Sequence, residues 1–159
     1  MGARMLKTSR ISYGGTAAIV TSMALVSGLG AAEASKSVVV SALLIAALAD
    51  NLTDSLSIHI FQESEQLEKK EVFAGTVTNF VTRLLVCLSF ILLFGLLPVS
   101  VAVEGVIAWG MSLLAALTYL VARERKVGAS LEVIKHLLGA ATVIIVSQAI
   151  GRWISTTLG

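Results

Sequence analysis

ADNLTDSLS, residues 49–57, places two carboxylates inside an apolar run that otherwise has the length and composition of a membrane-spanning helix. An acidic side chain in the middle of such a helix costs about 2.5–3.5 kcal/mol on insertion scales, so it needs a partner or water. Asp50 and Asp54 are four residues apart, which puts both carboxylates on one stripe of the helix. We expect this stripe to face protein or water and not lipid.

The composition of the whole chain is typical of a membrane protein. Its 159 residues have a mean hydropathy of +0.89, and 56% are hydrophobic while only 14% are charged. These values lie outside the range of soluble globular domains. We therefore predict an all-α integral membrane protein with a single transmembrane domain over residues 1–159.

Five apolar segments are long enough to cross a bilayer, for which about 20 helical residues are needed. The predicted spans cover residues 11–30, 37–62, 74–97, 101–121 and 131–154. The first span follows a basic segment, as in a signal peptide. We interpret it as a transmembrane helix, because it is longer than the apolar region of a signal peptide and leads directly into a second span.

The distribution of lysine and arginine predicts the orientation, because short cytoplasmic loops carry an excess of these residues. With a cytoplasmic N-terminus nine lie inside and two outside: Arg4, Lys7, Arg10, Lys69, Lys70, Arg123, Arg125, Lys126 and Lys135 against Lys36 and Arg152. We expect this orientation in the cell (inner) membrane of a prokaryote or in an organelle membrane of a eukaryote.

Several classes of protein are disfavoured. The chain shows no nucleophile–base or zinc-ligand spacing, so we do not expect an enzyme or a tightly bound cofactor. The excess of 12 basic over 10 acidic residues is small, and no aromatic–basic interleaving predicts a nucleic-acid partner. Cys87 is the single cysteine, and we interpret it as a small packing residue.

Arg83 is a basic residue inside the third predicted span. Counting helical rise from the loop between the second and third spans places it at the level of Asp54. We predict a structural ion pair between Arg83 and Asp54, which would satisfy both groups in a low-dielectric interior. Asp50 lies one turn deeper, without an obvious cationic partner. It is our candidate for the principal polar group of a pore or of proton coupling.

Other side chains lie near the depth of Asp50. Met23, Met111 and Gln148 come from the first, fourth and fifth spans. With Asp50 and Asp54 they would form a metal or proton pathway in which methionine is a soft ligand. The more common role is structural, since methionine fills cores and glutamine forms interhelical hydrogen bonds.

A second group of candidates lies at the hairpin between the second and third spans. His59, Glu63 and Glu68 could capture a metal cation at the cytoplasmic mouth of a pathway. The alternative is a solvated face on which Lys69 and Lys70 balance the glutamates, with His59 as a hydrogen-bonded interfacial residue.

Segments of the chain resemble the vacuolar iron transporter family. AAIVTSMALVSG at residues 17–28 is similar to its first helix, and LAD at 48–50 with DSLS at 54–57 is similar to its second. GAA at 139–141 and IGR at 150–152 resemble its last helix. The resemblance covers nearly the whole chain and implies five spans, a homodimer with a pore between the protomers, and transport of Fe²⁺ or Mn²⁺ out of the cytosol in exchange for protons.

The chain departs from that family at several positions. The family's first-helix aspartate ligand corresponds to Ala17, its second-helix methionine ligand to Ile58, and a glycine–glutamate pair to Phe61 and Gln62. The long glutamate-rich metal-binding domain of the family is reduced to a short hairpin. The resemblance therefore implies the fold and the dimer more strongly than it implies the ion.

These observations lead to a first hypothesis of a homodimeric, proton-coupled transporter of divalent transition-metal ions, iron or manganese, in a lipid bilayer. One alternative is a membrane structural or interaction subunit that keeps the same fold without transport. Another is a transporter of a different solute.

Overall fold

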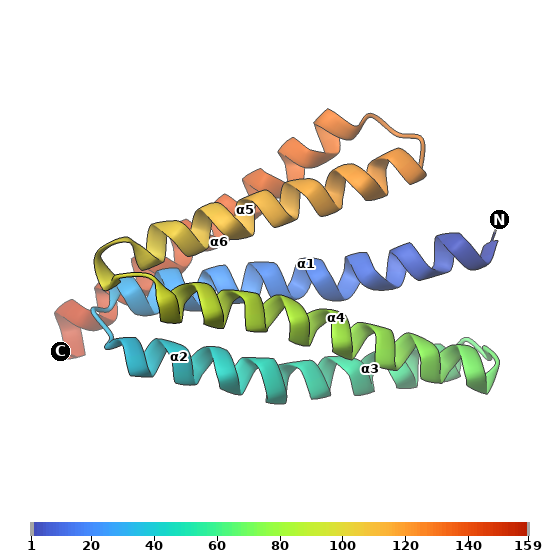
Figure 1. Cartoon of the computed structure of the whole chain (residues 1–159), viewed down its shortest axis with the longest axis horizontal. Helices are drawn as coiled ribbons and strands as arrows, with labels where there is room; N and C mark the ends of the chain where they lie inside the picture. Colours follow the sequence, from blue (N-terminus) through green and yellow to red (C-terminus); the bar gives the residue numbers. More distant parts are fainter. Residues whose placement is uncertain (1, 159) are drawn as a thin grey trace.

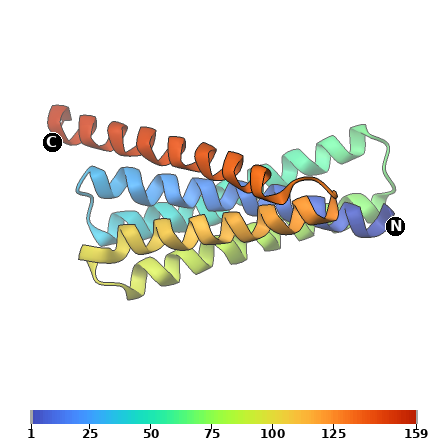
Figure 2. The ribbon, with the colours of Figure 1, turned by 90° about the horizontal axis from the view of Figure 1, so that it is seen from above.

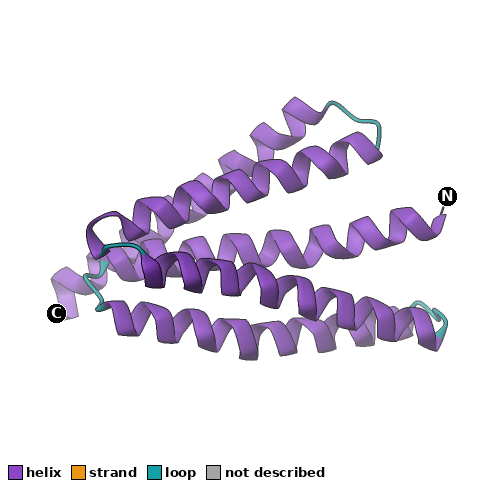
Figure 3. Cartoon of the chain, in the orientation of Figure 1, coloured by secondary structure: helices purple, strands orange, loops and turns teal. Residues whose placement is uncertain are grey.

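The computed structural model describes the backbone of residues 2–158 and the side chains of residues 14–158. Helices α1 (Gly2–Ala31), α4 (Lys69–Leu96), α5 (Val99–Glu124) and α6 (Ala129–Leu158) are each continuous. Helix α2 (Lys36–Ile45), the π-helical segment η1 (Ala46–Asp50) and α3 (Asn51–Ser64) follow one another without a loop. Figure 3 shows the short loops that join the helices.

Five helices in the described part of the chain are long and apolar enough to cross a membrane. The prediction of an all-α fold with five spans is therefore confirmed. Each helix extends beyond its predicted span at one end or both. The reason is that the prediction counted apolar residues, whereas helical hydrogen bonding continues through polar residues at the ends. The side chains of Arg4, Lys7 and Arg10, which the charge count uses, lie outside the described residues.

The outer surface of the bundle is apolar. Large hydrophobic side chains such as Leu85, Leu92 and Ile145 are each more than 60% exposed. Isolated apolar side chains are common on soluble proteins, but continuous apolar surface around long helices is not. This surface fits a bilayer, and the protein is an integral membrane protein.

Helix α1 is the central helix of the bundle. It packs against α4, α5 and α6, and Figure 1 shows it between the α5–α6 pair on one side and α4 with α2 and α3 on the other. The two ends of the chain lie at opposite ends of the molecule, as an odd number of antiparallel spans requires. Figure 2 shows that α6 runs at an angle to α1.

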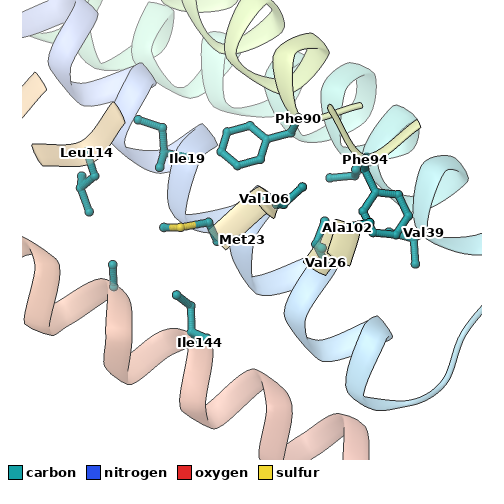
Figure 4. Packing of buried hydrophobic residues seen from close by; sticks show 12 residues of the cluster. Ile19, Met23, Val26, Val39, Phe90, Phe94, Ala102, Val106, Leu114 and Ile144 are labelled. Carbon is teal, nitrogen blue, oxygen red and sulfur yellow. The ribbon is translucent and has the colours of Figure 1, made fainter. Parts of the chain in front are cut away.

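An apolar core fills the contact between α1, α4 and α5. Met23, Phe90 and Val106 are completely buried. Figure 4 shows these side chains among the other members of the core. A side chain added at Gly110 would overlap the thioether of Met23. The glycine therefore allows α5 to approach α1 closely at this level, and the sulfur of Met23 fills the space that the glycine leaves.

The π-helical segment keeps one face of the second span buried. Leu43, Ala47, Asn51 and Ser55 are all buried and are spaced by four residues. In an α-helix, four residues rotate about 40° beyond a full turn, so a stripe with this spacing drifts around the helix. A π turn contains more residues per turn and offsets part of that drift. The segment thus leaves Asn51 and Ser55 on the buried face and ends at Asp50.

Candidate functional site

Arg83 is the centre of a polar cluster inside the bundle. It lies on α4, its side chain is 2% exposed, and it shares a buried face with Asn79 and Cys87, one turn away on either side. A buried arginine requires ionic and hydrogen-bonded partners, because desolvation of its charge is costly. The second span supplies them.

Two carboxylates contact the guanidinium of Arg83. Oδ2 of Asp50 accepts a hydrogen bond from Nη2 at 2.5 Å, and Oδ2 of Asp54 lies 3.2 Å from Nη1. The contact with Asp54 agrees with the predicted ion pair. The expectation that Asp50 lacks a cationic partner is wrong. The guanidinium carries five donors in a rigid planar fork, and it therefore reaches two carboxylates one helical turn apart.

Neutral side chains complete the cluster. Nε of Arg83 donates to Oδ1 of Asn51 at 2.9 Å. Nδ2 of Asn79 donates to Oδ2 of Asp54 at 3.1 Å and to Oγ of Ser55 at 3.2 Å. Our sequence reasoning missed these three partners. The available signal was their spacing, since Asn79 precedes Arg83 by four residues, and Asn51 and Ser55 are four residues apart.

Two buried polar atoms of the cluster lack a hydrogen-bond partner among the described residues. Nη1 of Arg83 is close to Asp54 but without the alignment of a hydrogen bond, and Oδ1 of Asn79 has no partner. A side chain at Gly14 would overlap that oxygen, so this glycine lets α1 close over Asn79. Among the described residues, the cluster therefore has one buried donor and one buried acceptor without a hydrogen bond.

The two carboxylates differ in their exposure. The side chain of Asp54 is 22% exposed, whereas that of Asp50 is 49% exposed and reaches the outer surface of the second span. With both aspartates ionised, the two carboxylates and one guanidinium carry a formal charge of about −1. The cluster therefore presents a carboxylate and a net negative charge to whatever covers this face.

Cys87 and Ser22 lie directly beyond Arg83. Sγ of Cys87 is 3.8 Å from Oγ of Ser22, and the cysteine packs with Ala18 and Ala47. The interpretation of Cys87 as a small packing residue is confirmed. These small side chains separate the polar cluster from the apolar core around Met23.

The methionines and Gln148 that we predicted around Asp50 lie on other faces of the bundle within one protomer, and the pathway remains a prediction. Met23 is buried in the apolar core, and Met111 packs against the same core. Gln148 is partly buried on α6, which packs against α1 and α5, whereas η1 and α3 pack against α4. The sequence predicted the depth of these residues in the membrane, but it did not predict which side of its helix each residue occupies.

The second group of candidates is only partly assembled. Nε2 of His59 lies 3.4 Å from Oε1 of Glu63, and Nδ1 lies 3.0 Å from the hydroxyl of Thr76. That hydroxyl donates to the carbonyl of Val72, so Nδ1 donates to Thr76 and is not free to bind a metal. Glu68 precedes α4 as an exposed residue and forms no hydrogen bond or ion pair with the others in the described part.

No cluster of three or more histidine, cysteine, aspartate or glutamate side chains that could hold a metal ion is present in the described residues. Comparisons with protein-family models, curated proteins and solved structures find no match to this chain. The resemblance to the vacuolar iron transporter family remains a prediction.

Proposed function

We propose that the chain is a membrane transporter of divalent transition-metal ions such as Fe²⁺ or Mn²⁺, with a cytoplasmic N-terminus and a homodimeric assembly. The observation that carries this proposal is the half-exposed carboxylate of Asp50 inside a spanning helix. A charged group on a lipid-facing surface is costly, so protein or a water-filled path covers it in the membrane.

A second copy of the chain is the partner that covers Asp50. Two-fold dimers are the commonest homo-oligomers, and the same face then meets itself across the axis. Two clusters, each with a formal charge of about −1, together match the charge of one divalent cation. The path for the cation then runs between the two second spans, with Asp50 of each protomer as its principal polar group.

Arg83 acts as a positioning residue in this mechanism. It holds Asp50 through Nη2 and keeps Asp54 and Asn51 as further partners. A cation that binds Asp50 replaces one contact of the guanidinium while the others hold Arg83 in place. Protonation of Asp50 removes its attraction for the cation, which couples transport to the proton gradient.

The test is ion uptake into proteoliposomes. The purified chain is reconstituted, and uptake of Fe²⁺, Mn²⁺, Co²⁺ and Zn²⁺ is measured at two pH values for the wild type and for Asp50→Asn. Loss of a charged contact worth about 1.5–3 kcal/mol corresponds to a decrease in uptake of about tenfold or more. Glu104→Gln is the matched control, because it neutralises an exposed carboxylate on α5 and should leave uptake unchanged.

Two results would overturn the proposal. One is a wild type that takes up none of the four ions above empty liposomes. The other is an Asp50→Asn variant that transports as fast as the Glu104→Gln control.

A structural or interaction subunit without transport is the second candidate. The observation that favours it is that Arg83 already contacts both carboxylates, so each has an internal counter-ion. Such a subunit would form a stable dimer in lipid and show no ion uptake. Transport of another solute would instead appear as uptake of that solute that depends on Asp50.

A further inference from the structure

A cavity of about 640 Å³ lies between α1, the end of α5 and the first turns of α6. An adjoining cavity of about 370 Å³ shares Thr16, Val20 and His136 with it and continues along α6 to Gly139. We call the two together the α5–α6 crevice. Figure 1 shows that the α5–α6 pair inclines away from α1 toward this end of the bundle.

At its other end, α6 crosses α1 closely. There, a side chain at Gly151 would overlap the backbone of Gly28, and one at Gly28 would touch the backbone of Ser147. Small residues allow this close crossing of two helices in lipid. Since α6 runs at an angle to α1, contact at one end leaves space at the other.

The walls of the crevice are apolar and its mouth is polar. Ala17, Val20, Leu117 and Val121 line the wall between α1 and α5. Thr118 is 8% exposed, lines the same wall and has no hydrogen-bond partner among the described residues. The mouth is lined by Arg125, Glu132 and His136, at the level of the loop between α5 and α6.

The charge at the mouth is positive. Glu132 is neutralised by Lys135, whose Nζ donates to its carboxylate at 3.0 Å. Nδ1 of His136 lies 2.8 Å from the carbonyl oxygen of Glu132, to which it donates, and Nε2 forms no hydrogen bond with the other described residues. Arg125 forms no ion pair within residues 14–158 and lines the cavity directly. An anionic group at the mouth would therefore meet an arginine that lacks a carboxylate partner.

We propose that the α5–α6 crevice binds an anionic phospholipid, with the phosphate at Arg125 and one acyl chain along the wall formed by α1 and α5. Basic residues at the ends of transmembrane helices lie at the level of lipid headgroups and attract anionic lipids. A soluble anion would leave the apolar wall uncovered, and a zwitterionic lipid would leave Arg125 without a net negative partner. An anionic lipid satisfies both parts of the crevice.

The experiment measures lipid binding to the full chain by native mass spectrometry in mild detergent. Dioleoylphosphatidylglycerol and dioleoylphosphatidylcholine are compared, because they share acyl chains and differ in headgroup charge. One Lys or Arg near an anionic headgroup contributes about a fivefold preference, which is the expected difference for the wild type. Arg125→Gln should remove most of it. Arg152→Gln, an equal loss of charge on an exposed position at the other end of α6, should retain it.

A second variant tests the position of the acyl chain. Thr16→Phe fills the crevice from α1 and should weaken binding of both lipids, with helicity and elution volume confirming that the variant is folded. Glycerol 3-phosphate, which has no acyl chain, should not compete with phosphatidylglycerol. The proposal is overturned by equal binding of the two lipids to the wild type, by equal effects of Arg125→Gln and Arg152→Gln, by unchanged binding to folded Thr16→Phe, or by competition from glycerol 3-phosphate.

Discussion

Helices α1 and α4 pass through two interiors of opposite character. Near one end, Gly14 of α1 faces Asn79 and Arg83 of α4, and the contacts are ionic and directional. About two turns further along, Met23 and Phe90 lie in an apolar core. In both places a glycine lets another helix approach α1: Gly14 of α1 lies against α4, and Gly110 of α5 lies against Met23. Close approach of the helices therefore does not determine whether a contact is polar or apolar. The side chains opposite the glycine determine it.

The two regions should respond to mutation in different ways. In the polar cluster, each partner of Arg83 limits the cost of burying a charge, so removal of one group leaves another uncompensated. In the apolar core, the loss is set by the volume removed or added.

Arg83→Met should cause the largest loss of stability. It leaves Asp50 and Asp54 without their cation, and breaking a buried ion pair typically costs about 3–5 kcal/mol. The measurement is denaturant or thermal unfolding of the purified chain in mild detergent. Arg152→Met, at an exposed position, is the control. Adding Asp50→Asn and Asp54→Asn to Arg83→Met should restore much of the loss, and failure to do so would show that charge balance is not what the cluster requires.

Met23→Ala should be the second largest change. The side chain is fully buried, and truncation of a buried methionine costs about 2–5 kcal/mol through the cavity that it leaves. Met111→Ala, on a partly buried position beside the same core, should cost less. Unfolding in detergent measures both variants. Equal losses would mean that the core does not distinguish a fully buried thioether from a partly buried one.

Gly110→Ala should destabilise by overpacking. The added methyl group overlaps Met23, and inserting such a group into a packed core costs about 1–3 kcal/mol. Combined with Met23→Ala, the loss should be smaller than the sum of the single losses, because the two sites share one space. Gly139→Ala is the control, since a side chain there meets nothing within 4 Å. Additive losses in the double variant would contradict the proposed contact.

Asp54→Asn should lose more stability than Asp50→Asn, because Asp54 is the more buried of the two aspartates. Asp54 accepts from Asn79 and lies beside Arg83 with 22% of its side chain exposed, so losing its charge should cost about 1.5–3 kcal/mol. Asp50 is half-exposed in the isolated protomer, and its pair should contribute about 1 kcal/mol or less. Unfolding of the two variants in detergent measures this difference. A larger loss for Asp50→Asn would show that Asp50 is buried in the assembled protein.

Some features of the site could be predicted from the sequence and others could not. The level of Arg83 relative to Asp54 follows from helical rise, and the structure places the two side chains in contact. The contact of Arg83 with Asp50 was missed because Asp50 lies one helical turn away from the level of Arg83. The arginine side chain is long enough to reach it. Within one protomer Met23 and Met111 lie at the apolar core and Gln148 lies on α6, because residues at equal depth on different helices can face in different directions.

The sequence alone predicts five apolar segments, their lengths and the unusual presence of two aspartates in one of them. These features can be predicted because the period of a helix and the thickness of a bilayer are constants. The sequence alone does not determine which faces of the helices meet. The π turn at Ala46–Asp50, the approach of α1 over Asn79 at Gly14 and the burial of Met23 against Gly110 depend on the angles at which five helices pack together. Those angles result from the simultaneous fit of all the side chains, so only the folded bundle determines that Asp50 shares Arg83 with Asp54 and still reaches the surface.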